Sequence, residues 1–127
     1  MTNFTTALKI ITLLIVLIVP VLAQDERKNE VMVKGEVIDL ACFITNKDAG
    51  KGPDHKECAI RCAKSGVPLG LLEDGTGTVY YTVKMKNKNN ANDMMIPFIA
   101  KKVLIKGKIA ARGGTKLLLI DMIEKVN

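Results

Sequence analysis

Three cysteines and one histidine gather in a single stretch of this 127-residue chain. Cys42, Cys58 and Cys62 are its only cysteines, and His55 is its only histidine. Thiolate sulfur and neutral imidazole nitrogen are the donors that zinc and copper prefer in proteins. Their spacing, C-x12-H-x2-C-x3-C, lacks the paired C-x2-C of common zinc ribbons, the C-x-x-C-H of covalent haem attachment and the C-x-x-C of thioredoxin-like proteins. The stretch therefore predicts a thiolate and imidazole metal site of unusual spacing.

A short helix is expected to carry three of these four residues. Asp54 is a favoured N-cap residue that opens a D-x-x-E capping box, and Gly66 suits the left-handed position after the last turn. His55, Cys58 and Cys62 then lie at i, i+3 and i+7, on one face of the helix. The helix N-terminus disfavours imidazolium and favours thiolate, so the local field suits a neutral His55 and an ionised Cys58.

The fourth predicted ligand, Cys42, comes from the end of an earlier extended segment. Asp39 lies three residues before it among apolar neighbours, and three roles fit this acid: a further ligand, a hydrogen-bond acceptor behind an imidazole ligand, or a turn cap. Four protein ligands would close the site. A closed site favours a structural, carrier or electron-transfer role over hydrolysis, and no Ser/His/Asp or paired-carboxylate set argues for an enzyme. Copper and zinc fit the donors equally.

A disulfide is the competing interpretation of the same residues. Three cysteines is an odd number for an exported protein, and a bridge from Cys42 to Cys58 or Cys62 would leave one free thiol. In that alternative the protein is a metal-free interaction module that binds an anionic partner through its basic face.

The motif as a whole resembles one found in small exported bacterial proteins of unassigned function. Its pattern is D-x-x-C…H-x-x-C-A-x-x-C-x-x-x-G-x-P-x-G-L-L, which runs here from Asp39 to Leu72. The C-x3-C spacing is also similar to that of copper sites in exported copper chaperones and terminal oxidases, although those families place their histidine after the cysteines. The resemblance implies that these residues belong together, and it implies no activity.

The N-terminal segment predicts export. Residues 8–22 form an apolar run, and Val21-Leu22-Ala23 supplies small residues for cleavage after Ala23, so residues 1–23 are expected to be a signal peptide, with an uncleaved anchor as the alternative. Residues 24–30 would be a flexible arm and residues 31–127 one domain. The expected location is the periplasm or the exterior, with no membrane span after cleavage.

The implied partner is a metal-delivery or redox protein. Nucleic acid is not expected despite the net charge of +6, because aromatic residues make up only 4% of the chain. The oligomeric state is not indicated.

The expected fold is mainly β: a small, partly open OB-like barrel of about five strands with one inserted cysteine-bearing helix. Residues 31–42 alternate in polarity, 69–72 and 78–85 are rich in strand formers, and 102–111 and 115–126 form a hairpin around Gly113-Gly114. Gly35 suggests a bulge or sharp coil, 94–102 a short helix or irregular crossing, and 87–93 a polar loop with little order. A two-layer α+β sandwich is the alternative.

Overall fold

The computed structural model describes residues 30–46 and 50–126. The predicted signal peptide and residues 24–29 of the predicted arm lie outside the described residues. Within the described part, the strands are β1 (Glu30–Asp39), β2 (Leu69–Glu73), β3 (Val79–Lys84), β4 (Lys102–Arg112) and β5 (Thr115–Lys125). The helices are α2 (Leu40–Thr45), α3 (Lys56–Lys64) and α4 (Asn92–Met95), with 3-10 turns η1 (Pro53–His55) and η2 (Ile96–Phe98).

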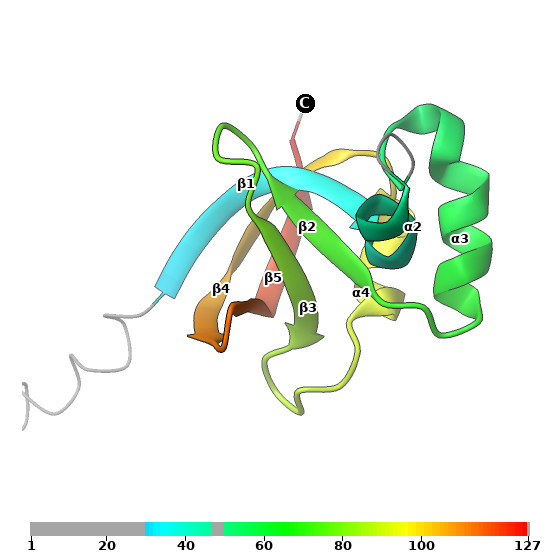
Figure 1. Cartoon of the computed structure of the whole chain (residues 1–127). Coiled ribbons are helices and arrows are strands. Elements are labelled where there is room, and N and C mark those ends of the chain that lie inside the picture. The colour runs from blue at the N-terminus through cyan, green and yellow to red at the C-terminus, as the bar shows by residue number, and fades with distance from the viewer. Residues whose placement is uncertain (1–29, 47–49, 127) are drawn as a thin grey trace, which may run out of the picture. The chain divides into compact units, whose positions relative to one another are not determined.

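The five strands form a closed barrel in the order β1-β2-β3-β5-β4 (Figure 1). The pairs β1–β2, β2–β3 and β4–β5 are antiparallel, whereas β3 and β5 run parallel. The predicted small barrel with a cysteine-bearing helix is thus confirmed, and it is closed where the sequence suggested a partly open one. Closure removes the exposed sheet edges that an open barrel would leave, and it excludes the two-layer sandwich.

The core fills the barrel interior with apolar side chains from all five strands. Its buried members are Val33, Val37, Ala59, Ala63, Leu69, Leu71, Tyr80, Ala91, Met95, Ile99, Val103, Ile105, Leu118 and Ile120. Burying a Val, Leu or Ile side chain contributes about 1.5–3 kcal/mol, so the strands provide most of the apolar stabilisation. Helix α3 contributes only Ala59 and Ala63 to this set.

Two glycines let neighbouring strands approach closely as they coil round the barrel. A Cβ on Gly35 would lie 2.3 Å from the carbonyl oxygen of Leu72, and one on Gly107 would lie 2.0 Å from that of Leu119. The β4–β5 register shifts between Lys106 and Gly107, as expected of a bulge. Gly35 remains in register with Glu73, so there is no bulge at this position. Its missing side chain lets β2 approach β1 closely where the strand curves.

The β4–β5 hairpin confirms the predicted turn. Arg112 pairs with Thr115, and the two residues between them, Gly113 and Gly114, have φ angles of 56° and 80°. Positive φ at both central residues is the requirement of a type I′ turn, whose twist matches that of the strands.

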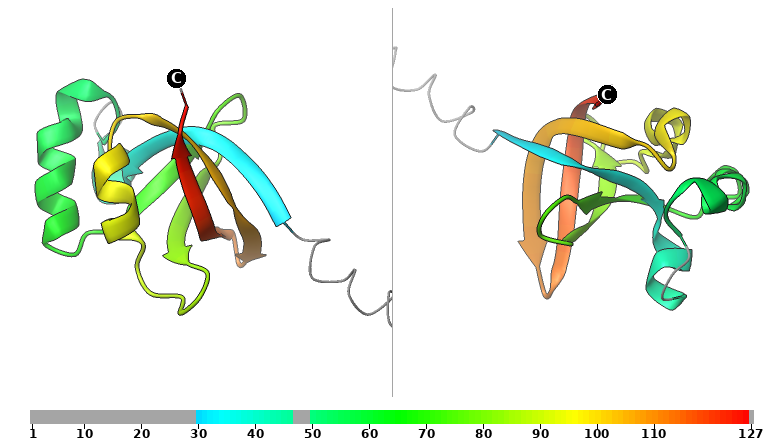
Figure 2. Two further views of the ribbon diagram at one scale, coloured as in Figure 1. Left: turned by 180° about the vertical axis from the view of Figure 1, so that it is seen from behind. Right: turned by 90° about the horizontal axis from the view of Figure 1, so that it is seen from above.

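Helices α2, α3 and α4 gather on one side of the barrel, beside the end of β1 (Figure 2). They come from two chain segments that are far apart in sequence, residues 40–64 and 92–95. This side of the barrel is where all three cysteines lie.

Candidate metal centre

The first strand ends three residues earlier than the sequence predicted. β1 stops at Asp39, and Cys42 is the third residue of helix α2, whereas an extended segment was expected to continue to Cys42. The reason is the cap: Asp39 is extended (φ −78°, ψ 110°) and its side chain accepts a hydrogen bond from the Cys42 N–H at 3.1 Å. An N-cap carboxylate of this kind starts a helix. Of the three roles considered for Asp39, the cap is therefore present.

The second cysteine-bearing helix begins with a tighter turn than predicted. Pro53 opens the 3-10 turn η1, so Asp54 lies within that turn, and α3 starts at Lys56 with His55 as its N-cap residue. No side-chain hydrogen bond caps η1 or α3, so the predicted capping box at Asp54 is wrong. Proline is favoured at the first position of a helical turn because its fixed φ angle is already helical. The 3-10 turn that it opens comes before α3, so α3 starts later in the chain than predicted.

The end of α3 matches the prediction. Gly66 has a φ of 99°, its N–H donates to the Ala63 carbonyl, and the Val67 N–H donates to the Cys62 carbonyl at 3.0 Å. These two bonds are the Schellman pattern. They fix the last turn of α3, on which Cys62 lies.

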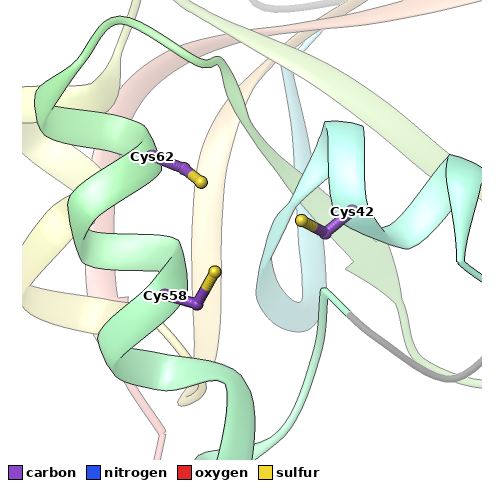
Figure 3. Close-up of side chains that lie close together, drawn as sticks. All are labelled: Cys42, Cys58 and Cys62. Atoms are coloured by element: carbon purple, nitrogen blue, oxygen red, sulfur yellow. The ribbon is translucent and has the colours of Figure 1, made fainter.

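The three sulfur atoms meet between α2 and α3 (Figure 3). Cys42 points from α2 toward Cys58 and Cys62, which project from successive turns of α3. The sulfur atoms all lie within 4.8 Å of one another, each residue is partly buried, and no disulfide joins them. Zn–S bonds of about 2.3 Å in a tetrahedral sphere place sulfur atoms about 3.8 Å apart, so a small closing movement would suffice for one ion.

His55 lies in a second donor group, which overlaps the first at Cys42. Donor atoms of Asp39, Cys42 and His55 all lie within 4.8 Å of one another. His55 Nε2 is 3.9 Å from Asp39 Oδ2, the Asp39 side chain is fully buried, and that of His55 is 18% exposed. Neither of these two atoms has a hydrogen-bond partner. The structure thus brings all five predicted site residues together, as two donor groups that share Cys42.

The loop before η1 places His55 beside Asp39. The Asp39 N–H donates to the Gly50 carbonyl at 2.9 Å, and the Gly52 N–H donates to Glu36 Oε1 at 2.5 Å. Gly50 has a φ of 85°, and a Cβ there would lie 2.2 Å from the Phe43 nitrogen. Only glycine fits this close approach to α2.

Asn92 positions the other end of α3, and the sequence did not reveal it. Its Nδ2 donates to the carbonyls of Ala63 and Val67 at 2.9 and 2.7 Å, and its Oδ1 accepts from the Leu69 N–H at 3.0 Å. Residues 87–93 were expected to be a loop with little order, but Asn92 is buried and opens α4. The available signal was only an asparagine before an apolar run, which suits many loops equally.

The carboxylate of Asp39 raises the pKa of the nearby thiols. The pKa of Cys62 rises to about 12, mainly because the neighbouring Asp39 side chain favours the protonated thiol, and further because of burial. The pKa of Cys42 is raised by burial and then by the charge of Asp39. Both thiols are therefore protonated at neutral pH without an ion. Protonated thiols exchange slowly with disulfides, and a metal ion must displace their protons to bind.

Among the described residues, no helix is both long enough and apolar enough to cross a membrane. Comparison of the chain with protein-family models, curated proteins and solved structures finds no match. The geometry of the two donor groups is therefore the basis for assigning a function.

Proposed function

We propose that this protein is an exported metal-binding protein that holds copper or zinc on the thiolates of Cys42, Cys58 and Cys62. His55 supplies an imidazole ligand, and Asp39 lies beside it. The proposed export depends on the predicted signal peptide, and the protein is proposed to bind and pass on the ion without catalysing a reaction.

One observation carries the proposal: three free thiols from two helices lie with all their sulfur atoms within 4.8 Å. Small apolar packing alone would not require three cysteines to face one another, and three thiolates are a donor set selective for soft and borderline metals. Zinc and Cu(I) both suit it.

A carrier role is favoured over a purely structural one by the location of the cluster. The barrel has its own apolar core, to which α3 adds two alanines, so the ion is not needed to complete that core. The three cysteines are partly exposed, which leaves the sulfur atoms within reach of a partner's ligands. A metal-delivery or redox protein is the partner that fits such a site.

Metal content and thiol count test the proposal together. The full chain, purified without added metal and then loaded with either zinc or Cu(I), should retain the ion through desalting and show three titratable thiols after denaturation with chelator. A chain that binds neither metal and shows one thiol would contain a disulfide, and the metal-free interaction module would replace the proposal.

A matched pair of variants tests the ligand assignment. Cys42→Ser should lower metal affinity by more than about 100-fold, beyond the 10–100-fold typical of losing an outer partner of a ligand. The control is Ala41→Ser, which introduces the same serine side chain at the neighbouring, exposed position of α2. It should leave metal affinity unchanged. Equal affinity in the two variants would remove Cys42 from the site.

A further inference from the structure

Two buried polar atoms face each other without a hydrogen bond beside the sulfur cluster. They are Asp39 Oδ2 and His55 Nε2, and neither has a partner. Buried polar atoms almost always have a hydrogen-bond partner. Two neighbouring buried atoms that both lack one therefore indicate a missing ligand.

Their separation suits an ion between them. The two atoms are 3.9 Å apart, which is too long for a direct hydrogen bond. A tetrahedral zinc with Zn–N and Zn–O bonds of about 2.0–2.2 Å places the two atoms about 3.4 Å apart, so a small closing movement would let both bind one ion. Cys42 Sγ is the third donor of the same group, in which one donor atom from each residue lies within 4.8 Å of the others.

The sulfur cluster and this second group share one atom. Cys42 belongs to both, while Cys58 and Cys62 complete one group and Asp39 and His55 complete the other. A thiolate has enough lone pairs to bridge two metal ions, and metal pairs in proteins lie about 3.5–4 Å apart.

We propose that the protein binds two metal ions, bridged by the Cys42 thiolate. One ion lies among Cys42, Cys58 and Cys62. The other is a borderline divalent ion such as zinc, held by Cys42, His55 and Asp39. This inference rests on the proposed function, since the first ion occupies the thiolate cluster described there, and it assigns the imidazole of His55 to the second ion instead of the first.

Charge balance supports the second ion. Three thiolates and one carboxylate carry four negative charges, so one divalent ion would leave two of them uncompensated and two divalent ions would neutralise all four. Among the described residues, no lysine or arginine lies within ion-pair distance, 4.0 Å, of the fully buried Asp39 carboxylate. An uncompensated buried charge is costly, and a second cation removes that cost.

Counting bound zinc by native mass spectrometry tests the inference. The reduced full chain is titrated with zinc alone, and two ions per chain are expected. Asp39→Asn keeps an N-cap side chain on α2 but removes the charge, and it should bind one ion fewer. His55→Ala should also bind one ion fewer, and because His55 is partly exposed this variant carries the test if Asp39→Asn does not fold. Asp54→Asn, at a neighbouring exposed acid, should still bind two.

The outcomes separate this inference from the proposed function. One ion in the unmodified chain would overturn the second site and leave the thiolate site standing, whereas no ion would overturn both. Two ions that persist in both Asp39→Asn and His55→Ala would place the second ion elsewhere and overturn the assignment. Loss of both ions in these two variants would also overturn it, because the ion in the thiolate cluster would then depend on Asp39 and His55, which the inference assigns to the second ion alone.

Discussion

Asp39 lies where β1 ends and α2 begins, and its two carboxylate oxygens have different surroundings. Oδ1 accepts the hydrogen bond from the Cys42 N–H that starts α2, while Oδ2 faces His55 without a partner. A single side chain thus sets the direction of Cys42 and lies within reach of the imidazole. The roles of cap and ligand, which the sequence presented as alternatives, are compatible because they use different oxygens.

At the residue scale, metal binding should depend strongly on pH. The pKa of Cys62 is raised to about 12, and that of Cys42 is also raised, so both thiols hold protons between pH 6 and 8. An ion must displace these protons, so affinity increases as pH rises and falls as pH drops. The protons displaced from Cys42 and Cys62 alone predict a change of about 100-fold in apparent zinc affinity per pH unit. Competition with a chelator of known affinity at several pH values measures this slope, and a flat profile would mean that thiols are not the ligands.

At the element scale, α3 packs on the barrel core through Ala59, Ala63 and the partly buried Ile60. Its buried residues are two alanines, which remove little apolar surface from water, so the three hydrogen bonds of Asn92 are the main attachment of its C-terminal end. Asn92→Ala leaves the Leu69 N–H and the Val67 carbonyl without this partner, while the Ala63 carbonyl keeps only the Gly66 N–H. We expect this variant to lose about 2–4 kcal/mol of unfolding free energy.

The control for this substitution is Asn89→Ala, in the exposed part of the same segment, where a change below about 0.5 kcal/mol is expected. Chemical denaturation of the metal-free protein measures both values. Metal affinity should also fall in Asn92→Ala alone, because Cys62 lies on the last turn that Asn92 holds. Equal stability of the two variants would show that Asn92 does not anchor α3.

The loop between α2 and η1 depends on Gly50 in a similar way. Gly50→Ala meets both a positive φ and a collision with the backbone of Phe43, whereas Gly75→Ala, in the β2–β3 turn, meets a positive φ with open space around the new methyl group. The strain alone costs about 1–2 kcal/mol, so Gly75→Ala should lose about that much and Gly50→Ala clearly more. Only Gly50→Ala should also weaken zinc binding, as measured by chelator competition. Equal affinity in the two variants would show that this loop does not position His55.

Local patterns predicted those elements whose causes are local. The alternation of β1, the Gly113-Gly114 turn and the Gly66 end of α3 each follow from a few adjacent residues, and each is present. The start of α2 was missed because the apolar alternation continues through D-x-x-C, which favours a longer strand. Only the hydrogen bond from the Cys42 N–H to the Asp39 side chain shows that a helix begins there. Asn92 was missed because its partners lie 23 to 29 residues away in the sequence. The overlap of two donor groups at Cys42 depends on the same long-range packing.

At the scale of the whole molecule, the cluster and the core are stabilised by separate contacts. The barrel closes through strand pairing and packs its interior largely with residues of the strands, while the cysteines lie on α2 and α3 outside it. Regions with few buried apolar contacts open locally at lower free energy than the core does. Removing the ion should therefore loosen α3 and leave the barrel folded.

Hydrogen exchange of the zinc-loaded and chelated protein tests this separation. Amides of α3 should exchange at least about tenfold faster after chelation, whereas amides of β4 and β5, the longest paired strands, should change little. An ion that binds only the folded state stabilises the segment that opens when the ion leaves. The amides whose exchange accelerates on chelation therefore identify the segment that the metal stabilises. Uniform acceleration across β4, β5 and α3 would mean that the ion is required for the whole fold, and a carrier that releases its ion would then have to unfold to do so.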